Sequence, residues 1–184
     1  MPDSYIVEHC SPTLKGLKTG NLFTVKDAGS AKEEIRDINR RINGYGLRMV
    51  PMRHSRGKVL VYLYRPDRLK ADLENPAAAW ILKRLGYPVE NSEKCVAVAA
   101  RHLREDASFP HEIGLFLSYP PEDVQGFMDH PTEGVKAVGC WKVYGDQESA
   151  ERTFRSYRQC TEICRQAIRC GSTLEQLITA EKGE

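Results

Sequence analysis

The spacing of apolar residues changes repeatedly along this chain, and the order of those changes restricts the fold more than any single motif does. Ala31, Ile35, Ile38 and Ile42 recur at helical spacing, and a longer helical pattern begins after residue 146 and ends by residue 171. Two strand-like runs, residues 47–52 and 58–64, are separated by a short polar turn and predict a β-hairpin. Pro51 near the end of the first run favours an edge position for that strand.

Other segments complete a mixed order of helices and strands. Residues 22–25, 113–118 and 137–144 are strand-like, and the run at 113–118 is apolar on both faces, which is typical of a central strand. Helical patterns cover residues 11–17, 66–73, 76–85, 92–104 and 120–128, and a capping box at 172–175 predicts a last helix. Because the order is not a regular β-α-β alternation, it predicts an α+β fold. We expect one compact domain over residues 1–184, with a small mixed or antiparallel sheet flanked by helices and residues 145–184 packed on it as a helical segment.

The chain lacks the patterns of membrane-spanning and secreted proteins. Its longest apolar runs, such as residues 59–64 and 113–117, are far shorter than the roughly 20 residues that a membrane span needs. The first residues contain no basic region followed by a long apolar core, so no signal peptide is predicted. The six cysteines form no regular framework and are expected to be free thiols. These patterns favour a cytoplasmic protein.

A net charge of +2 conceals two segments of opposite sign. Residues 31–70 contain 11 Lys or Arg against four acids, whereas residues 105–134 contain seven acids and no Lys or Arg. The two segments could attract each other across the fold, or the basic one could bind an anionic ligand. Candidate anion-binding residues are Lys18, Arg65 and Lys142. No nucleic-acid recognition motif accompanies the basic segment, so a nucleic-acid partner is not expected.

Cys10 is the residue that most suggests chemistry. Ser11-Pro12 is typical of an N-cap followed by proline at the first helical position, so Cys10 would lie just before a short helix. Unsatisfied backbone N–H groups and the helix dipole would stabilise a thiolate there. The sequence therefore makes Cys10 a candidate nucleophile; the alternative is a small buried residue beside the helix.

His111 and Glu112 lead into the expected central strand. A histidine at the head of such a strand would be held rigidly at a sheet end, so His111 is the candidate general base. Glu112 would face the opposite side of the strand and completes the set of candidate catalytic residues. Together with Cys10, they suggest a thiol-dependent hydrolase or an acyl or amide transferase that acts on a small molecule or a peptide.

A metal-binding protein is the alternative function. His9, Cys10, His111, Glu112 and Cys140 offer a mixed nitrogen, sulfur and oxygen set that suits a transition metal, iron in the first place, or an iron-containing cofactor. Cys140 shares one face of its expected strand with Lys142, where it could also be a core residue. Cys160, Cys164 and Cys170 form no CxxC pair and indicate no further metal site.

Three long segments carry a family resemblance. Glu-His-Cys-Ser-Pro-Thr-Leu (8–14), Phe-Pro-His-Glu-Ile-Gly-Leu-Phe-Leu-Ser-Tyr-Pro-Pro-Glu-Asp-Val (109–124) and Gly-Cys-Trp-Lys-Val-Tyr-Gly-Asp (139–146) resemble a bacterial family, mostly from anaerobes, that is catalogued as a domain of unknown function. The resemblance covers nearly the whole chain. It implies no established activity, but it does imply a gene neighbourhood of ferrous-iron uptake and flavodoxins, which favours an iron-related role.

A fainter likeness is to papain-like cell-wall endopeptidases. In those enzymes the nucleophilic cysteine lies at a helix N-terminus and the histidine begins a strand that contains glycine. Cys10 and His111 match in kind, although His111 is one residue out of register with that pattern.

Overall fold

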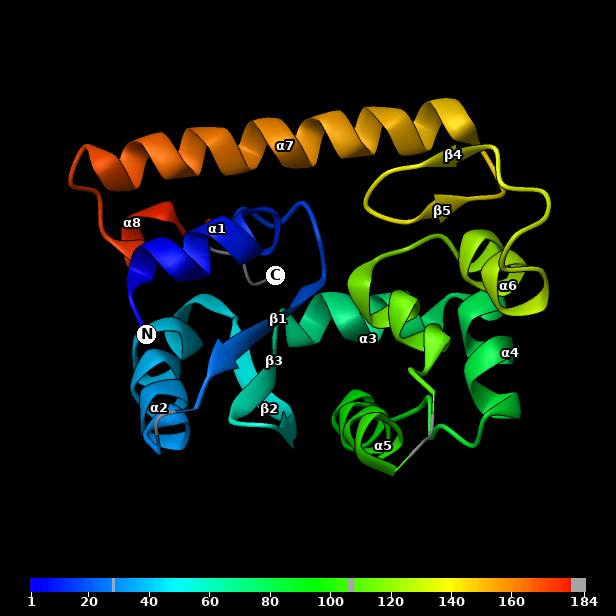
Figure 1. Cartoon of the computed structure of the whole chain (residues 1–184), viewed down its shortest axis with the longest axis horizontal. Coiled ribbons are helices and arrows are strands. Elements are labelled where there is room, and N and C mark those ends of the chain that lie inside the picture. The colour runs from blue at the N-terminus through cyan, green and yellow to red at the C-terminus, as the bar shows by residue number, and fades with distance from the viewer. Residues whose placement is uncertain (28, 106–107, 180–184) are drawn as a thin grey trace.

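A three-stranded antiparallel sheet forms the centre of the computed structural model, which describes residues 1–27, 29–105 and 108–179 (Figure 1). Its strands are β1 (Gly20–Lys26), β2 (Arg48–Ser55) and β3 (Lys58–Tyr64), in the order β1-β3-β2. β2 is an edge strand, as Pro51 predicts, and the register shifts between Pro51 and Arg53 in a bulge. Arg56 and Gly57 connect β2 to β3 with φ values of 50° and 69°, which suit a tight hairpin turn.

Both faces of the sheet are buried because alternate residues of the central strand enter two different hydrophobic clusters. Val59, Val61 and Leu63 of β3 belong to the first cluster. Tyr62 and Tyr64 belong to the second cluster, on the opposite face. The side-chain period of two thus divides the core into two layers.

Helices cover each face. Those that contribute to the first cluster are α1 (Asp3–Leu14), α2 (Ala31–Ile42), α8 (Leu174–Leu177) and the C-terminal part of α7 (Gln147–Arg169). Those of the second cluster are α3 (Pro66–Glu74), α4 (Pro76–Arg84), α5 (Ser92–Glu105), α6 (Pro121–Asp129) and the 3-10 helix η2 (His111–Leu117). A short 3-10 helix η1 (Asn43–Tyr45) follows α2, and a small hairpin of β4 (Ala137–Val138) and β5 (Lys142–Val143) precedes α7. This arrangement confirms a single compact α+β domain with a small antiparallel sheet.

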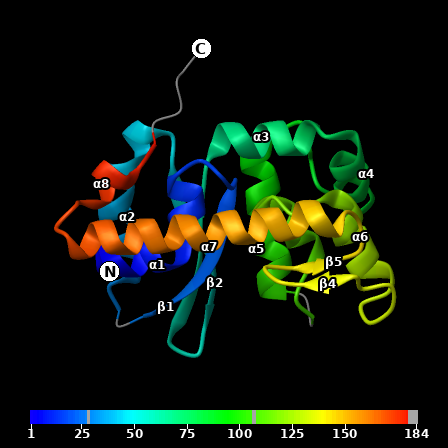
Figure 2. The same cartoon turned by 90° about the horizontal axis from the view of Figure 1, so that it is seen from above.

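The long helix α7 crosses the whole molecule (Figures 1 and 2). Its N-cap is Asp146, whose side chain accepts a hydrogen bond from the backbone N–H of Ser149 at 3.0 Å. Near this end, Phe154 and Tyr157 pack with Trp141 of the β4–β5 hairpin in a third cluster. Toward the other end, α7 packs on α1. One helix therefore connects the hairpin to the first hydrophobic cluster.

The most distinct error of the sequence prediction is the expected central strand at 113–118, which is the 3-10 helix η2. The run is apolar on both faces because it is buried inside the second cluster, and burial alone does not distinguish a strand from a helix. Gly114 allows close packing here, since a Cβ at this position would lie 2.9 Å from both Tyr119 and Val124. Ser118, with a φ of 58°, ends the helix in a left-handed conformation.

Three local boundaries also differ from expectation. Residues 137–144 form a two-stranded hairpin rather than one strand, and a Cβ at Gly139, in the connection, would collide with Phe154 at 2.2 Å. The first helix begins at Asp3 and contains Pro12, because the apolar positions Ile6, Val7 and Cys10 extend its buried face toward the N-terminus. The capping box of α8 joins Thr173 to Gln176 rather than Ser172 to Glu175. Of the expected C-terminal helical segment, residues 180–184 lie outside the described part of the chain.

No helix of the described residues has both the length and the apolarity to cross a membrane.

Candidate functional site

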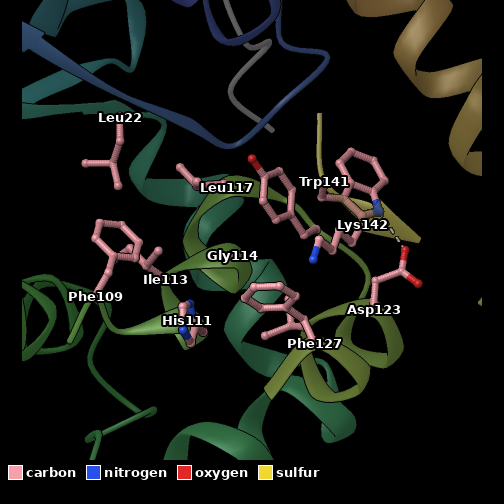
Figure 3. Close-up of a pocket in the computed structure, with 12 residues that line it drawn as sticks. Leu22, Phe109, His111, Ile113, Gly114, Leu117, Asp123, Phe127, Trp141 and Lys142 are labelled. Carbon is pink, nitrogen blue, oxygen red and sulfur yellow. Dashed lines mark hydrogen bonds between the residues drawn. The ribbon is translucent and has the colours of Figure 1, made fainter. Parts of the chain in front are cut away.

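A cavity of about 400 Å³ lies beside η2, α6 and the β4–β5 hairpin (Figure 3). Its lining combines one residue of β1 with residues 109 to 142 of the later chain. The lining residues are Leu22, Phe109, His111, Ile113, Gly114, Leu117, Tyr119, Asp123, Val124, Phe127, Trp141 and Lys142. We call this cavity the aromatic pocket.

Aromatic rings contact one another in the walls of the aromatic pocket. Phe109 and Ile113 lie on one side of the view and Trp141 on the other (Figure 3). The His111 ring meets the Phe127 ring edge to face, with centroids 4.7 Å apart, and the Tyr119 and Trp141 centroids are 4.8 Å apart. Such contacts fix the orientation of large side chains at little entropic cost, so the pocket is largely preformed.

Lys142 and His111 bring ionisable groups to this apolar surface. The Nζ of Lys142 donates a hydrogen bond to the carbonyl of Pro131 at 2.7 Å and lies 5.2 Å from the centroid of the Phe127 ring. An ammonium has three N–H donors, so this bond leaves donors for a ligand. His111 is exposed and contributes a ring that can donate or accept.

Asp123 also lines the pocket, but its carboxylate is occupied. One oxygen accepts a bond from the indole N–H of Trp141 at 2.6 Å, and the other accepts from the backbone N–H groups of Tyr144 and Gly145, both at 2.7 Å. The side chain is buried, with 2% exposed. Asp123 therefore holds the hairpin against α6 and orients Trp141 toward the pocket.

The structure contradicts the helix-start position of Cys10. Cys10 lies inside α1, is fully buried, and belongs to the first hydrophobic cluster. Burial raises the pKa of its thiol well above the usual range, since a thiolate would lose its hydration there. The alternative interpretation, a small core residue, is the one that this geometry supports.

His111 and Glu112 occupy separate environments, and neither approaches Cys10. His111 lines the aromatic pocket, whereas Glu112 is buried and accepts a hydrogen bond from the Tyr87 hydroxyl at 2.9 Å. The same Glu112 oxygen lies 3.1 Å from Nδ1 of His102. The two residues thus point to different sides, as expected, but from a 3-10 helix and not from a strand. The structure does not assemble the expected Cys10–His111–Glu112 set.

The expected metal-ligand set is dispersed as well. Among the described residues, no group of three or more His, Cys, Asp or Glu side chains could hold a metal ion. His9 stacks on Phe23 with centroids 5.7 Å apart, and Cys140 is exposed beside the hairpin turn. Cys10 belongs to the first cluster, whereas Glu112 is buried beside Tyr87 of the second cluster, on the other face of the sheet.

The three anion-binding candidates lie in different environments. Arg65 is fully buried and donates to the carbonyl oxygens of Thr13, Leu14 and Thr179, so it caps the end of α1 and serves structure. Lys142 lines the aromatic pocket. Lys18 is buried beside a second cavity.

The oppositely charged segments find partners elsewhere. Arg41 pairs with Asp3 and Glu175, and Arg48 pairs with Glu93, all outside residues 105–134. Asp106 of the acidic segment lies outside the described residues. These pairs use part of the basic charge to join α2 to α1 and α8, and β2 to α5, rather than to form a binding face.

Sequence reasoning did not select Tyr119, Asp123, Phe127 or Trp141 as site residues. Asp123 lies in the first turn of α6, where an acid suits the helix dipole, but its main partners come from residues 141–145. A tryptophan flanked by Gly139 and Gly145 was the available signal, since a large ring in a glycine-containing turn needs a specific packing site.

Comparison with known protein families identifies the family of this chain. A family model described as "Protein of unknown function (DUF3793)" matches residues 6–178, which is nearly the whole sequence. The chain therefore belongs to this family, and the expected resemblance to a family of unknown function is confirmed. No curated protein and no solved structure matches the chain.

Proposed function

We propose that this member of the DUF3793 family binds a small apolar or aromatic ligand that carries an acidic group, and that the aromatic pocket is the binding site. The observation that supports this best is a cavity of about 400 Å³ whose walls are mainly apolar, with Phe109, Tyr119, Phe127 and Trp141 among them, and whose lining includes Lys142. That volume lies in the range of about 300–1,000 Å³ typical of small-molecule sites.

The ligand body would replace water against the rings of Phe109, Phe127 and Trp141. Removing apolar surface from water is the main favourable term for such a ligand, and ring–ring contacts add to it. The acidic group would lie near Lys142, whose remaining N–H donors can form charge-assisted hydrogen bonds with it. His111, across the Phe127 ring, is a second donor for the same group.

Binding fits this pocket better than the thiol-enzyme and iron-binding interpretations do. Those interpretations depend on Cys10, which is buried in the first hydrophobic cluster on α1. The carboxylate in the pocket, Asp123, already accepts three hydrogen bonds, so it is poorly suited to act as a base. We place the protein in the cytoplasm, where six unpaired cysteines would stay reduced.

The two tryptophans allow a direct test. Trp80 is 52% exposed on α4, so Trp80→Phe leaves Trp141, which lines the pocket, as the single tryptophan. In that background, titration with phenylbutyrate should shift the Trp141 emission saturably. The neutral analogue phenylbutanol should bind about tenfold more weakly, because it lacks the charge for Lys142.

Two variants complete the test. Lys142→Met should remove the preference for the acid and leave the alcohol nearly unaffected. Lys136→Met, which removes a lysine from the same hairpin but outside the pocket, should change neither affinity. The absence of a saturable Trp141 response to both compounds, or an acid preference that is undiminished in Lys142→Met, would count against the proposal.

A further inference from the structure

Lys18 lies in an unusual position for a lysine. It follows α1, just before β1, and only 5% of it is exposed. It lines a second cavity, of about 650 Å³, between α1, the β4–β5 hairpin and α7. The other lining residues used below are His9, Cys140, Tyr157, Arg158, Glu162 and Arg165. We call this second cavity the Lys18 cavity; it shares no lining residue with the aromatic pocket.

Two tyrosine rings flank the ammonium. Its Nζ is 5.4 Å from the centroid of Tyr119 and 5.7 Å from that of Tyr157, which are cation–π distances. In the part of the chain that the structure describes, the Lys18 ammonium forms neither a hydrogen bond nor an ion pair within the usual distances. The rings attract the cation but supply no negative charge to it.

Tyr119, Tyr157 and Cys10, which lie near Lys18, stay neutral near neutral pH. Burial raises the pKa of both Tyr119 and Tyr157 to about 12, and burial also raises the pKa of the Cys10 thiol above its usual range. A buried ammonium without a counter-ion is costly. Accordingly, burial lowers the pKa of Lys18 to about 8, and the nearby thiols of Cys140 and Cys10 oppose that shift only in part.

The charges around the Lys18 cavity also favour an anion. Arg158 lines it from the exposed side of α7, and His9 lines it from α1. Glu162 is the acid among the lining residues, and Arg165 already pairs with it and with Glu8. The cavity thus offers the positive charge of Arg158, while Glu162 and Glu8 are already paired with Arg165.

We propose that the Lys18 cavity binds a small anionic ligand, whose carboxylate or phosphate oxygens act as the counter-ion of the Lys18 ammonium between the rings of Tyr119 and Tyr157. Arg158 at the rim would contact the same anion. Tyr119 also lines the aromatic pocket, but Lys18, Tyr157 and Arg158 do not, so the two proposals can be tested separately.

Isothermal titration calorimetry with inorganic phosphate and with citrate tests this proposal on the full chain. Below the Lys18 pKa of about 8, at least one of the two anions should bind saturably. Binding should be accompanied by proton uptake near that pH, since the anion stabilises the charged form, and affinity should fall as the pH rises through it. Cys140→Ser should leave this pH dependence in place, which separates Lys18 from the neighbouring thiol.

Lys18→Met should weaken the binding by at least about tenfold. Lys15→Met, which removes a lysine that follows α1 but does not line the cavity, should not. Because Lys18→Met replaces an uncompensated buried charge with an apolar chain, the variant should unfold at the same temperature as the parent or at a higher one.

Absence of binding by both anions, binding that persists in Lys18→Met, or a marked loss of thermal stability in that variant would each overturn the proposal. Phenylbutyrate binding reported by Trp141 should be unchanged in Lys18→Met, so the two proposals can fail separately.

Discussion

At the scale of single residues, burial determines which nucleophilic side chains are available. Cys10 has the sequence context of a reactive thiol, yet it lies in the first hydrophobic cluster with its pKa raised by burial. Cys140 and Cys170, which have no such context, are exposed. Thiol reactivity depends on both thiolate fraction and access, and Cys10 has neither.

Brief treatment of the native protein with iodoacetamide should therefore label Cys140 and Cys170 and leave Cys10 unmodified. Mass spectrometry of the resulting peptides reads each site, and denaturation before labelling should make Cys10 react like the others. Labelling of Cys10 in the native state, ahead of Cys140, would restore the nucleophile interpretation.

At the scale of elements, one buried carboxylate connects α6 to the β4–β5 hairpin. The hairpin strands are only two residues each, too short to hold their position by ladder hydrogen bonds alone. Asp123 compensates with three hydrogen bonds to residues 141–145, one of which orients Trp141. Packing of Trp141 against Phe154, with centroids 4.5 Å apart, then connects the hairpin to α7.

Asp123→Asn should reduce the free energy of unfolding by at least the roughly 1.5–3 kcal/mol associated with one hydrogen bond to a charged group. If the asparagine oxygen keeps the two backbone donors, its amide nitrogen faces the indole N–H of Trp141, and two donors cannot bond. Urea unfolding measures the loss, and a red shift of Trp141 emission in the Trp80→Phe background reports the loosened hairpin. Asp129→Asn, an exposed site at the end of the same helix, is the control. Equal stabilities of the two variants would mean that Asp123 does not hold the hairpin.

At the scale of the whole molecule, the two ends of the described chain are joined by a charge cluster. Arg41 of α2 bonds both oxygens of Asp3 in α1, at 2.8 and 2.7 Å, and one oxygen of Glu175 in α8, at 2.5 Å. The Arg41 hydrogen bond is the largest cause that lowers the pKa of Glu175, to about 2. The cluster holds α8 beside α1 and α2, and so keeps α8 packed on the first hydrophobic cluster.

Because of this cluster, the free energy of unfolding should depend on pH in the acid range. The folded pKa of Glu175 lies below its ordinary value of 4.5, so its contribution is fully present above that value and is lost as the pH falls toward about 2. Glu175→Gln should be less stable at neutral pH and should lose less stability than the parent over that acid range. Urea midpoints at several pH values test this, with the exposed Glu148→Gln as the control. A parent and a Glu175→Gln variant with the same pH dependence would contradict the role of the cluster.

Local signals in the sequence were sufficient for many elements. The spacing of Ala31, Ile35, Ile38 and Ile42 predicted α2 correctly, and Pro51 predicted the edge strand. Prolines at 66 and 76, and Asp146 before the longest helical pattern, marked the starts of α3, α4 and α7. These signals depend on neighbours along the chain, so the α+β class and most helix boundaries follow from sequence alone.

The tertiary structure decided what depends on distant contacts. Whether residues 113–117 form a strand or a 3-10 helix depended on packing against Tyr119 and α6, which an apolar run does not encode. Similarly, whether the Cys10 thiol is exposed or buried depended on the apolar side chains that pack around it. The aromatic pocket joins Leu22 of β1 to Lys142 of β5 across the fold, so a local pattern could mark Trp141 but not the pocket that contains it. The sequence by itself determined most of the elements, because their signals are short-range. It also selected His111 and Lys142, but only the tertiary structure brings them together in one pocket, because burial and proximity are properties of the assembled chain.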